Sequence, residues 1–417
     1  MKGRKPELLI PASGPEALRT AVIFGADAVY IGGEAYGLRA KAKNFSMGEM
    51  AEGIAFAHAH GVKVYVTANI LAHNGDLEGA KRYFTELRDM RPQRADALII
   101  SDPGLFTLAR EVWPEAEIHI STQANNTNYR TWLFWWKLGA KRVVSARELS
   151  LEEIALIRRH IPAEMEIESF VHGAMCISYS GRCLLSNYFT GRDANKGACT
   201  HPCRWKYAVV EETRPGAYLP VYENERGTFI FNSTDLCMID HIPELVAAGI
   251  DSFKIEGRMK TALYVAAVAR AYRRALDDYF EDEEKYRKNR EWYRAEIAKC
   301  THRPFSTGFY FGKSDENTQI YDNSTYVDEY TYLGCVREVS STMLARIEQR
   351  NKFRVGDVIE IMKPDGSNVE ATVEAMYDGD LQPVESCPHA KQRIWLRLSR
   401  AAEMYDLLRV RNDPDGR

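Results

Sequence analysis

Five cysteines lie close together in the middle of this 417-residue chain, and thiols are the side chains best suited to hold a soft metal or a redox centre. They are Cys176, Cys183, Cys199, Cys203 and Cys237. Six, fifteen, three and thirty-three residues separate successive members, so no pair has the Cys-x-x-Cys spacing of zinc ribbons and thioredoxins. Thiolates that arrive from separated segments suit an iron-sulfur cluster, and zinc bound by four thiolates is the alternative.

Simple burial is the competing explanation for these thiols, because cysteine is among the residues most often found in protein cores. Five thiols within 62 residues, set among glycines and polar residues, favour a metal centre over that explanation. The other three cysteines stand alone in the sequence, and we expect ordinary burial for them. They are Cys300, Cys335 and Cys387.

Two basic stretches follow or surround the thiols. Residues 192–206 hold four cations against one acid, and residues 254–274 hold six against one, although the whole chain has a net charge of −3. A local basic rim on an acidic protein indicates an anionic ligand, namely a phosphate, a carboxylate or a nucleic acid. Within the second stretch we expect Lys254 and Arg258 to be functional. We expect Arg270, Arg273 and Arg274 to form a solvated helix face.

The overall composition argues against tight, general adhesion to nucleic acid or membrane, because the isoelectric point is near 6.4. The first residues lack the apolar run of a signal peptide, and no segment approaches the roughly 18 apolar residues of a membrane span. We therefore expect a cytoplasmic protein whose cysteines are reduced.

Eight short apolar runs alternate with longer amphipathic stretches and must position these groups. The runs are "ELLIPA", "AVYIGG", "KVYVTAN", "ALIISD", "EIHIST", "RVVSA", "MEIESFVHG" and "DSFKIEG". This alternation predicts an α/β fold, a (β/α)8 TIM-like barrel. A doubly wound open sheet is the rival fold, but no Gly-x-Gly-x-x-Gly motif follows the first run.

In such a barrel the active site forms at the carboxyl ends of the strands. Polar side chains gather there in this sequence: Asn69, Asp102, Ser121, Gln123, Asn125, Glu168, His172, Lys254, Glu256 and Arg258. We therefore expect the mouth of the barrel, at the carboxyl ends of the strands, to be lined by polar side chains.

The pattern divides the chain into three parts. We expect the barrel over residues 1–280, interrupted after strand seven by a cysteine-rich insertion at 173–236. Inside the insertion, "KYAVVEE" and "GTFIFNS" are typical of an antiparallel pair. Residues 281–304 are so charged that they predict a helical linker, and the short alternating runs of 305–417 predict a small C-terminal β-barrel.

One region resembles a known family. The segments "ESFVHGAMC" and "GRCLLS" follow the pattern Glu-x-Phe-x-x-Gly-Ala-x-Cys and Gly-x-Cys-x-x-Ser, which is similar to the signature of the peptidase U32 family, the collagenase-like proteases. Further matches are "LLIPASG", "DAVYIGG", "GLRAKAKNFS", "STQANNTN" and "FKIEGRMKTALYV". The resemblance covers residues 7 to about 280, and the β-rich tail resembles the small C-terminal domain of many members.

The resemblance implies RNA hydroxylation. Members similar to this chain include tRNA hydroxylation proteins that make 5-hydroxyuridine at the wobble position with prephenate, and hydroxylases of ubiquinone synthesis that carry a 4Fe-4S cluster on four cysteines. By position the cluster ligands are Cys176, Cys183, Cys199 and Cys237, with Cys203 as the alternative third ligand. The implied partners are tRNA and a small dicarboxylate, without a membrane. A second copy of the chain or a paralogous subunit is compatible with this scheme.

The implied reaction assigns roles to the polar residues. Prephenate carries two carboxylates, which planar guanidinium groups bind in a bidentate manner, so we expect a clamp from Arg39, Arg192 and Arg258. The strand-end residues expected to complete the substrate site are Gln123, Asn125 and Glu256. The residues expected to carry the chemistry are His172, Glu168 and Lys254.

Two other functions compete with this hypothesis. A U32-type peptidase would need a nucleophile or a metal-bound water, and the chain has no His-Glu-x-x-His and no Gly-x-Ser-x-Gly motif. Cys176 with His172 four residues away is the one candidate pair, which leaves the neighbouring thiols unexplained. A non-catalytic RNA-binding or assembly factor, in which the cluster only staples the insertion, is the other alternative.

Overall fold

The computed structural model describes most of the chain. The described residues are 3–37, 44–175, 185–192, 194, 198–200, 202, 209–210, 218–219, 222–224, 227–229, 232–312, 319–320, 329–389 and 391–412. Four residues of the expected site lie outside these ranges: Arg39, Cys176, Cys183 and Cys203.

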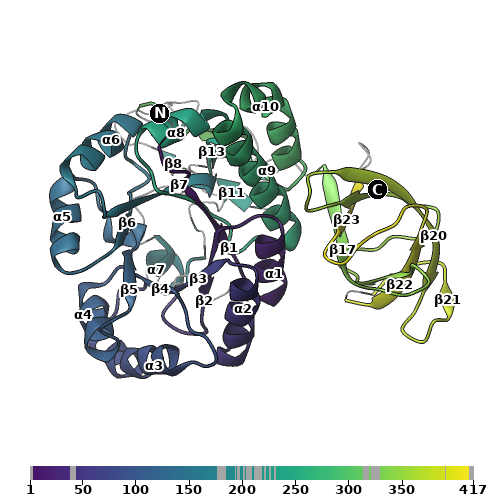
Figure 1. Ribbon diagram of the computed structural model, residues 1–417, viewed down its shortest axis with the longest axis horizontal. Coiled ribbons are helices and arrows are strands. Elements are labelled where there is room, and N and C mark those ends of the chain that lie inside the picture. Colours follow the sequence, from purple (N-terminus) through teal and green to yellow (C-terminus); the bar gives the residue numbers. More distant parts are fainter. Residues whose placement is uncertain are drawn as a thin grey trace.

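A closed parallel barrel forms the larger part of the molecule (Figure 1). Its strands are β1 (Glu7–Pro11), β2 (Ala28–Gly32), β3 (Lys63–Ala68), β4 (Ala97–Ile100), β5 (Glu117–Ile120), β6 (Arg142–Val144), β7 (Glu166–Ala174) and β14 (Ser252–Ile255). Each strand pairs with the next along the chain, and β14 pairs in parallel with both β7 and β1, which closes the ring. The predicted TIM-like barrel is confirmed.

Helices cover the outside of this barrel in the order expected of successive βα units. They are α1 (Pro15–Ile23), α2 (Met47–Ala59), α3 (Leu77–Asp89), α4 (Pro103–Val112), α5 (Tyr129–Lys137), α6 (Leu151–His160), α8 (Ile242–Ala247) and α9 (Ala262–Glu281). Local sequence explains several starts: Ser46 and Ser150 form capping boxes with Glu49 and Glu153, and Pro15 opens α1. The described helices are all too short or too polar to cross a lipid bilayer.

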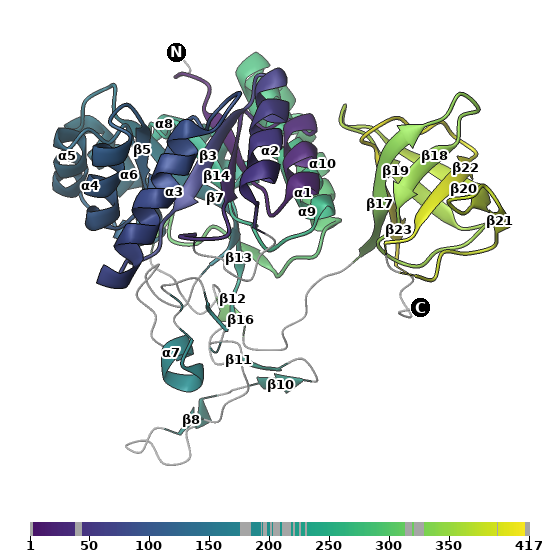
Figure 2. The same cartoon turned by 90° about the horizontal axis from the view of Figure 1, so that it is seen from below.

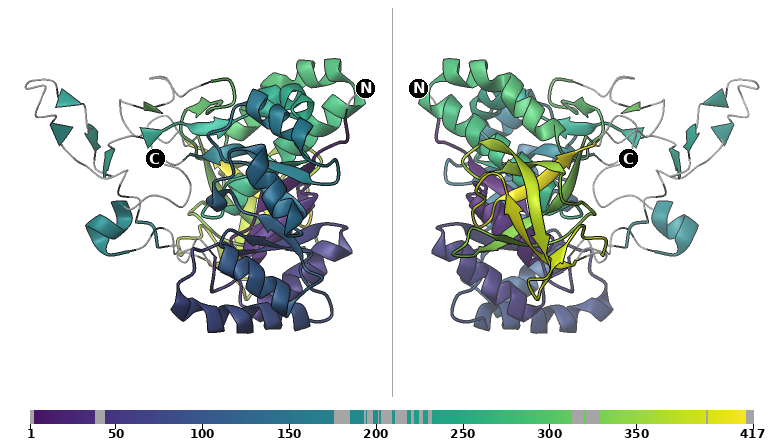
Figure 3. Two further views of the ribbon diagram at one scale, coloured as in Figure 1. Left: turned by 90° about the vertical axis from the view of Figure 1, so that its left-hand side faces the viewer. Right: turned by 90° about the vertical axis from the view of Figure 1, so that its right-hand side faces the viewer.

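The insertion leaves the barrel at the carboxyl end of β7, and its described elements lie beyond that end (Figures 2 and 3). They are α7 (Leu185–Thr190), β8 (Val209–Val210), β9 (Tyr218–Leu219), β10 (Tyr222–Asn224), β11 (Gly227–Phe229), β12 (Asn232–Ser233) and β13 (Asp235–Cys237). Among the described residues, the two segments that we expected to pair with each other pair elsewhere: β8 with β9 and β11 with β10. Each forms a local hairpin with its own neighbour in sequence.

Two short strands follow α10 (Glu283–Ala298), and one joins the large sheet while the other joins the insertion. β15 (Phe305–Ser306) pairs with β13, and β16 (Gln319–Ile320) pairs with β12. Residues from 305 that we assigned to the small domain thus extend the large one. The small barrel begins at Tyr330.

The small barrel is antiparallel and separate from the large one (Figure 2). Its strands are β17 (Tyr330–Val339), β18 (Ala345–Glu348), β19 (Val358–Met362), β20 (Asn368–Tyr377), β21 (Pro383–Val384), β22 (Arg393–Leu398) and β23 (Leu407–Arg411). The order β19-β23-β17-β18-β22-β20-β21 closes between β19 and β20 and encloses its own apolar core. The predicted C-terminal β-barrel is confirmed.

The charged segment between the two barrels is a packed helix. α10 (Glu283–Ala298) lies against α9 and buries Tyr286, Tyr293 and Ile297. Its Glu296 is 1% exposed and binds both Arg270 of α9 and Arg409 of β23, with N–O distances of 2.7 Å each. Arg270 is itself buried, which corrects our expectation of a solvated face, because its partners come from distant parts of the chain. These ion pairs join the small barrel to α9 and α10.

This buried carboxylate makes stability depend on pH. Burial alone would raise the pKa of Glu296, but Arg409 and Arg270 lower it from 4.5 to about 2. A lowered carboxyl pKa stabilises the fold above pH 4.5, and that contribution is lost as the pH falls toward 2. We expect Glu296→Gln to remove about 3 kcal/mol of pH-dependent stability, measured by urea unfolding at several pH values. The matched control is Glu291→Gln on the exposed face of α10, and equal pH profiles for both variants would contradict this account.

Candidate active site

A charged network fills the inside of the large barrel. Arg142 of β6 binds Glu7 at 2.6 Å, Glu166 at 2.6 Å and Glu168 at 3.0 Å. Lys254 of β14 donates to the other oxygen of Glu168 at 2.6 Å. The parallel register sets Ser252 beside Glu168, and side chains two residues apart on one strand share a face, so the alternation of β7 and β14 aims these groups inward.

Glu168 is held as a carboxylate in this network. Burial alone would raise the pKa of Glu168, but the charges of Lys254 and Arg142 outweigh burial and lower it. Both of its oxygens are occupied by ion pairs. This arrangement favours a positioning role for Glu168 over proton transfer, because the ion pair with Lys254 must open before Glu168 can take up a proton.

Lys254 connects the barrel interior to its mouth. Its ammonium lies 4.5 Å from the ring centre of Tyr30 and 5.4 Å from that of Phe170. Arg147 also contacts Phe170. Its guanidinium lies 4.0 Å from the Phe170 ring centre and 3.2 Å from the carboxylate of Glu256. The expected residues Glu168, Lys254 and Glu256 therefore belong to one continuous set of contacts.

Arg258 lies just after β14 at the same carboxyl end. It is 4% exposed, and its two terminal nitrogens donate to Thr67 at 3.1 Å and to Asn44 at 2.9 Å. Gly32 makes room for it, because a Cβ on Gly32 would lie 2.1 Å from Nη2 of Arg258. The guanidinium is thus fixed before any anion binds, which lowers the entropy cost of binding one.

The amide side chains after β5 form a separate part of the mouth. Ser121 caps the short turn Thr122–Ala124 and accepts a hydrogen bond from Asn69 at 3.3 Å. Gln123 has a buried Oε1 without a hydrogen-bond partner among the described residues, and Asn125 follows with φ 52°. An unsatisfied acceptor next to a left-handed residue suits a site that a ligand completes.

His172 lies apart from the charged network. It is 1% exposed, and its ring neighbours are Tyr264 and Tyr272 of α9 and Phe305 of β15, at 5.6 to 6.0 Å between ring centres. Burial lowers the pKa of His172 to about 3, so the imidazole is neutral at physiological pH. It can accept a proton only after the site opens to water or an anion approaches.

The thiols are only partly described. Cys237 ends β13 and pairs in register with His172, so one thiol stands at the barrel end from which the insertion departs. Cys199 and Arg192 lie within the insertion, Cys199 half-buried and Arg192 exposed. Within the described ranges no three metal-binding side chains converge, and Cys176, Cys183 and Cys203 lie outside them. Burial raises the pKa of the Cys237 thiol to about 12, so it is protonated in the free protein and would have to lose that proton to bind a metal as a thiolate.

Two mouth residues escaped the sequence analysis. Arg147 and Glu148 follow β6 after two small residues, and a charged pair directly behind a predicted strand is the signal that could have found them. Burial raises the pKa of Glu148, and its Oε2 has no hydrogen-bond partner in the described part of the chain. A carboxyl group of this kind keeps its proton more readily than an exposed one, which suits a proton donor.

The same chain is similar to known proteins along nearly its whole length. The model of "Peptidase family U32" matches residues 13–320, and that of "Peptidase family U32 C-terminal domain" matches residues 328–409. The tRNA hydroxylation protein P1 of Bacillus subtilis is 39% identical over 97% of this chain and 95% of its own length. The tRNA hydroxylation protein P of Escherichia coli is 38% identical, with 98% and 97% covered. An uncharacterized protease of Methanocaldococcus jannaschii is 39% identical over 89% of this chain and 90% of its own.

Proposed function

Because the chain belongs to peptidase family U32, and its full-length relatives include tRNA hydroxylation proteins, we propose that it is an enzyme that hydroxylates RNA. Its specific reaction in this proposal is the conversion of the wobble uridine of tRNA to 5-hydroxyuridine, with prephenate as co-substrate. The observation that carries the proposal is the similarity of both barrels, from end to end, to proteins named for that modification.

The barrel mouth supports a dicarboxylate co-substrate. Arg258 and Arg147 present guanidinium groups at the carboxyl end of the strands, and Lys254 adds an ammonium behind them. Guanidinium groups bind carboxylates through paired hydrogen bonds. In the proposed site Arg258 binds one carboxylate, and Arg147 is released from Glu256 to bind the other. Arg39 and Arg192 complete the proposed clamp.

The proton carriers follow from the same geometry. Glu148 is the acid in this proposal, since burial holds its carboxyl group in the protonated form more than usual. Lys254 remains oriented by Glu168, and His172 beside Cys237 becomes a base in this proposal only when the site opens or an anion approaches, because burial lowers its pKa to about 3. Gln123, Asn125 and Glu256 orient the uracil ring or the co-substrate through their polar groups.

The proposed redox centre is a 4Fe-4S cluster on Cys176, Cys183, Cys199 and Cys237, with Cys203 in place of Cys199 as the alternative and zinc as the alternative metal. Such a cluster supplies one-electron redox chemistry when bound. Cys237 supports the proposal because β13 fixes its thiol next to His172 and close to the barrel end.

A glycine substitution tests the role of Arg258. Gly32→Ala places a methyl group against the guanidinium and should displace it from Thr67 and Asn44. We expect the dissociation constant for prephenate, measured by isothermal titration calorimetry, to rise about tenfold or more, the cost of one charge-assisted hydrogen bond. Gly48→Ala is the control, because a Cβ at Gly48 meets nothing within 4 Å. Equal affinity in the two variants would rule out Arg258 as a carboxylate ligand.

Loss of the modification in cells tests the proposed function. Nucleosides of total tRNA from a strain without the gene should lack 5-hydroxyuridine and its derivatives, and the wild-type gene should restore them. The strain must also lack any paralogue of the gene. Unchanged nucleosides would show that wobble uridine is not the substrate. Cleavage of casein or gelatin by the purified protein would favour the peptidase function suggested by the name of the Methanocaldococcus jannaschii relative.

A further inference from the structure

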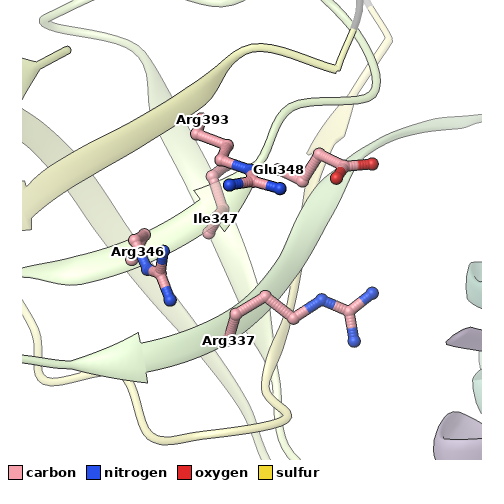
Figure 4. A pocket seen from close by; sticks show the side chains of 5 residues that line it. All are labelled: Arg337, Arg346, Ile347, Glu348 and Arg393. Atoms are coloured by element: carbon pink, nitrogen blue, oxygen red, sulfur yellow. The ribbon is translucent and has the colours of Figure 1, made fainter. Parts of the chain in front are cut away.

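A small hollow on the C-terminal barrel is lined mainly by arginines. Its volume is about 220 Å³, and its lining residues are Arg337, Arg346, Ile347, Glu348 and Arg393 (Figure 4). The three arginines come from β17, β18 and β22, which are adjacent in the sheet. Arg337 pairs with Glu16 and Arg346 with Glu338, so the positive charge that the hollow offers to a ligand comes chiefly from Arg393.

The pairing of the strands fixes the arrangement. Arg346 stands opposite Trp395 and Glu348 opposite Arg393 in the register of β18 and β22. The guanidinium of Arg346 lies 5.6 Å from the Trp395 ring, and Arg346 also pairs with Glu338 at 2.6 Å. Arg393 is exposed and makes no ion pair within the described residues. At least one guanidinium is therefore ready for an external anion, next to a partly exposed indole.

The hollow lies beside the active-site end of the large barrel. Glu16 is in the first turn of α1, directly after β1 ends, which places it at the carboxyl end of the strands. Glu16 binds Arg337 at 3.1 Å and accepts a hydrogen bond from Tyr332 at 2.8 Å. The buried pairs of Glu296 fix the small barrel against α9 and α10. Arg337, on one side of the hollow, thus lies against the carboxyl end of the barrel strands, the end at which the mouth opens.

We propose that this arginine hollow binds the phosphate backbone of the tRNA whose uridine enters the large barrel, an inference that rests on the proposed function. Its volume is below the roughly 300 Å³ typical of small-molecule pockets, so it suits a phosphodiester group that passes over it better than an enclosed metabolite. Guanidinium groups bind phosphate oxygens in pairs, and an aromatic ring beside them stacks on a base.

The test is binding of full-length protein to tRNA at several salt concentrations. The variant Arg346→Gln/Arg393→Gln should bind about tenfold more weakly than wild type, and its plot of log affinity against log salt should be less steep by roughly one to two. The control is Arg354→Gln, since Arg354 lies on the same barrel with a 77% exposed side chain and does not line the hollow. Equal thermal stability of both variants shows that each is folded.

The outcomes separate the two proposals. If the double variant keeps the affinity and the salt slope of the wild type, and the wild type still hydroxylates tRNA, then tRNA binding at the hollow is disproved and the proposed function stands. Wild-type protein that neither binds tRNA nor restores its hydroxylation in cells overturns the function itself, and the hollow with it. Displacement of tRNA by polyglutamate at an equal concentration of anionic groups would identify the hollow as a site for an acidic protein, which also overturns the inference.

Discussion

Replacing Cys237 with alanine is expected to remove the bound iron and reduce tRNA hydroxylation to background. Cys237 is the described member of the proposed ligand set whose backbone is fixed by strand pairing, through β13 to β7 and β15. A four-thiolate site that loses one such donor loses both its geometry and one of its charges. The measurement is visible absorption with iron and sulfide analysis after anaerobic purification, and the same variant is then tested for complementation in cells.

A cysteine outside the insertion provides the control. Cys387 is fully buried in the small barrel, where its thiol donates to the carbonyl of Phe353. Cys387→Ala should keep the iron content and the modification, at a modest cost in stability. A Cys237→Ala protein that retains the iron and the absorption of the wild type would eliminate Cys237 as a ligand, and a colourless wild type that contains zinc would eliminate the iron-sulfur proposal.

Replacing Glu168 with alanine is expected to lower the free energy of unfolding by about 3 to 5 kcal/mol, because it leaves two buried cations with less counter-charge. Glu168 is fully buried, and its partners Lys254 and Arg142 are each at most 5% exposed at the side chain. Urea unfolding at neutral pH, followed by tryptophan fluorescence, measures the change.

Two further variants separate the loss of charge from the loss of volume. Glu164→Ala, on an exposed position two residues before β7, should change stability by less than about 0.5 kcal/mol. Glu168→Leu combined with Lys254→Met removes most of the uncompensated charge and should recover a large part of the stability. If Glu168→Ala matches the Glu164→Ala control, the carboxylate does not hold the barrel interior together.

The sequence was most informative where chemistry follows directly from strand geometry. We expected Glu168, Lys254 and Glu256 at the carboxyl ends of strands, and the structure joins them in one set of contacts, although Glu168 lies near the start of β7. The U32 signature was also a correct guide, since both parts of the chain match that family. The spacing of short apolar runs in the sequence was enough to predict both the large barrel and the small β-domain.

Long-range partners explain most of what could not be predicted. The stretch 283–298 has the composition of a solvated helix, yet Tyr286, Tyr293 and Ile297 form one apolar stripe that α9 covers. In the sequence Arg270 has the pattern of a surface residue. In the structure it is buried and pairs with Glu296, which also binds Arg409 of the small barrel. His172 follows inward-facing positions on β7, but the strand pairing is irregular next to it and its neighbours are the rings of α9. None of these contacts is encoded in local sequence.

The central claim is that this chain adds an oxygen atom to the wobble uridine of tRNA. Mass spectrometry of anticodon-loop fragments, from a gene-deletion strain with and without the wild-type gene, tests it most directly. The account predicts that the fragment containing the wobble uridine becomes heavier by one oxygen atom, or by a modification built on that oxygen, only when the gene is present. Fragments of identical mass in the two strains, with the protein shown to be expressed and no paralogue present, would contradict it.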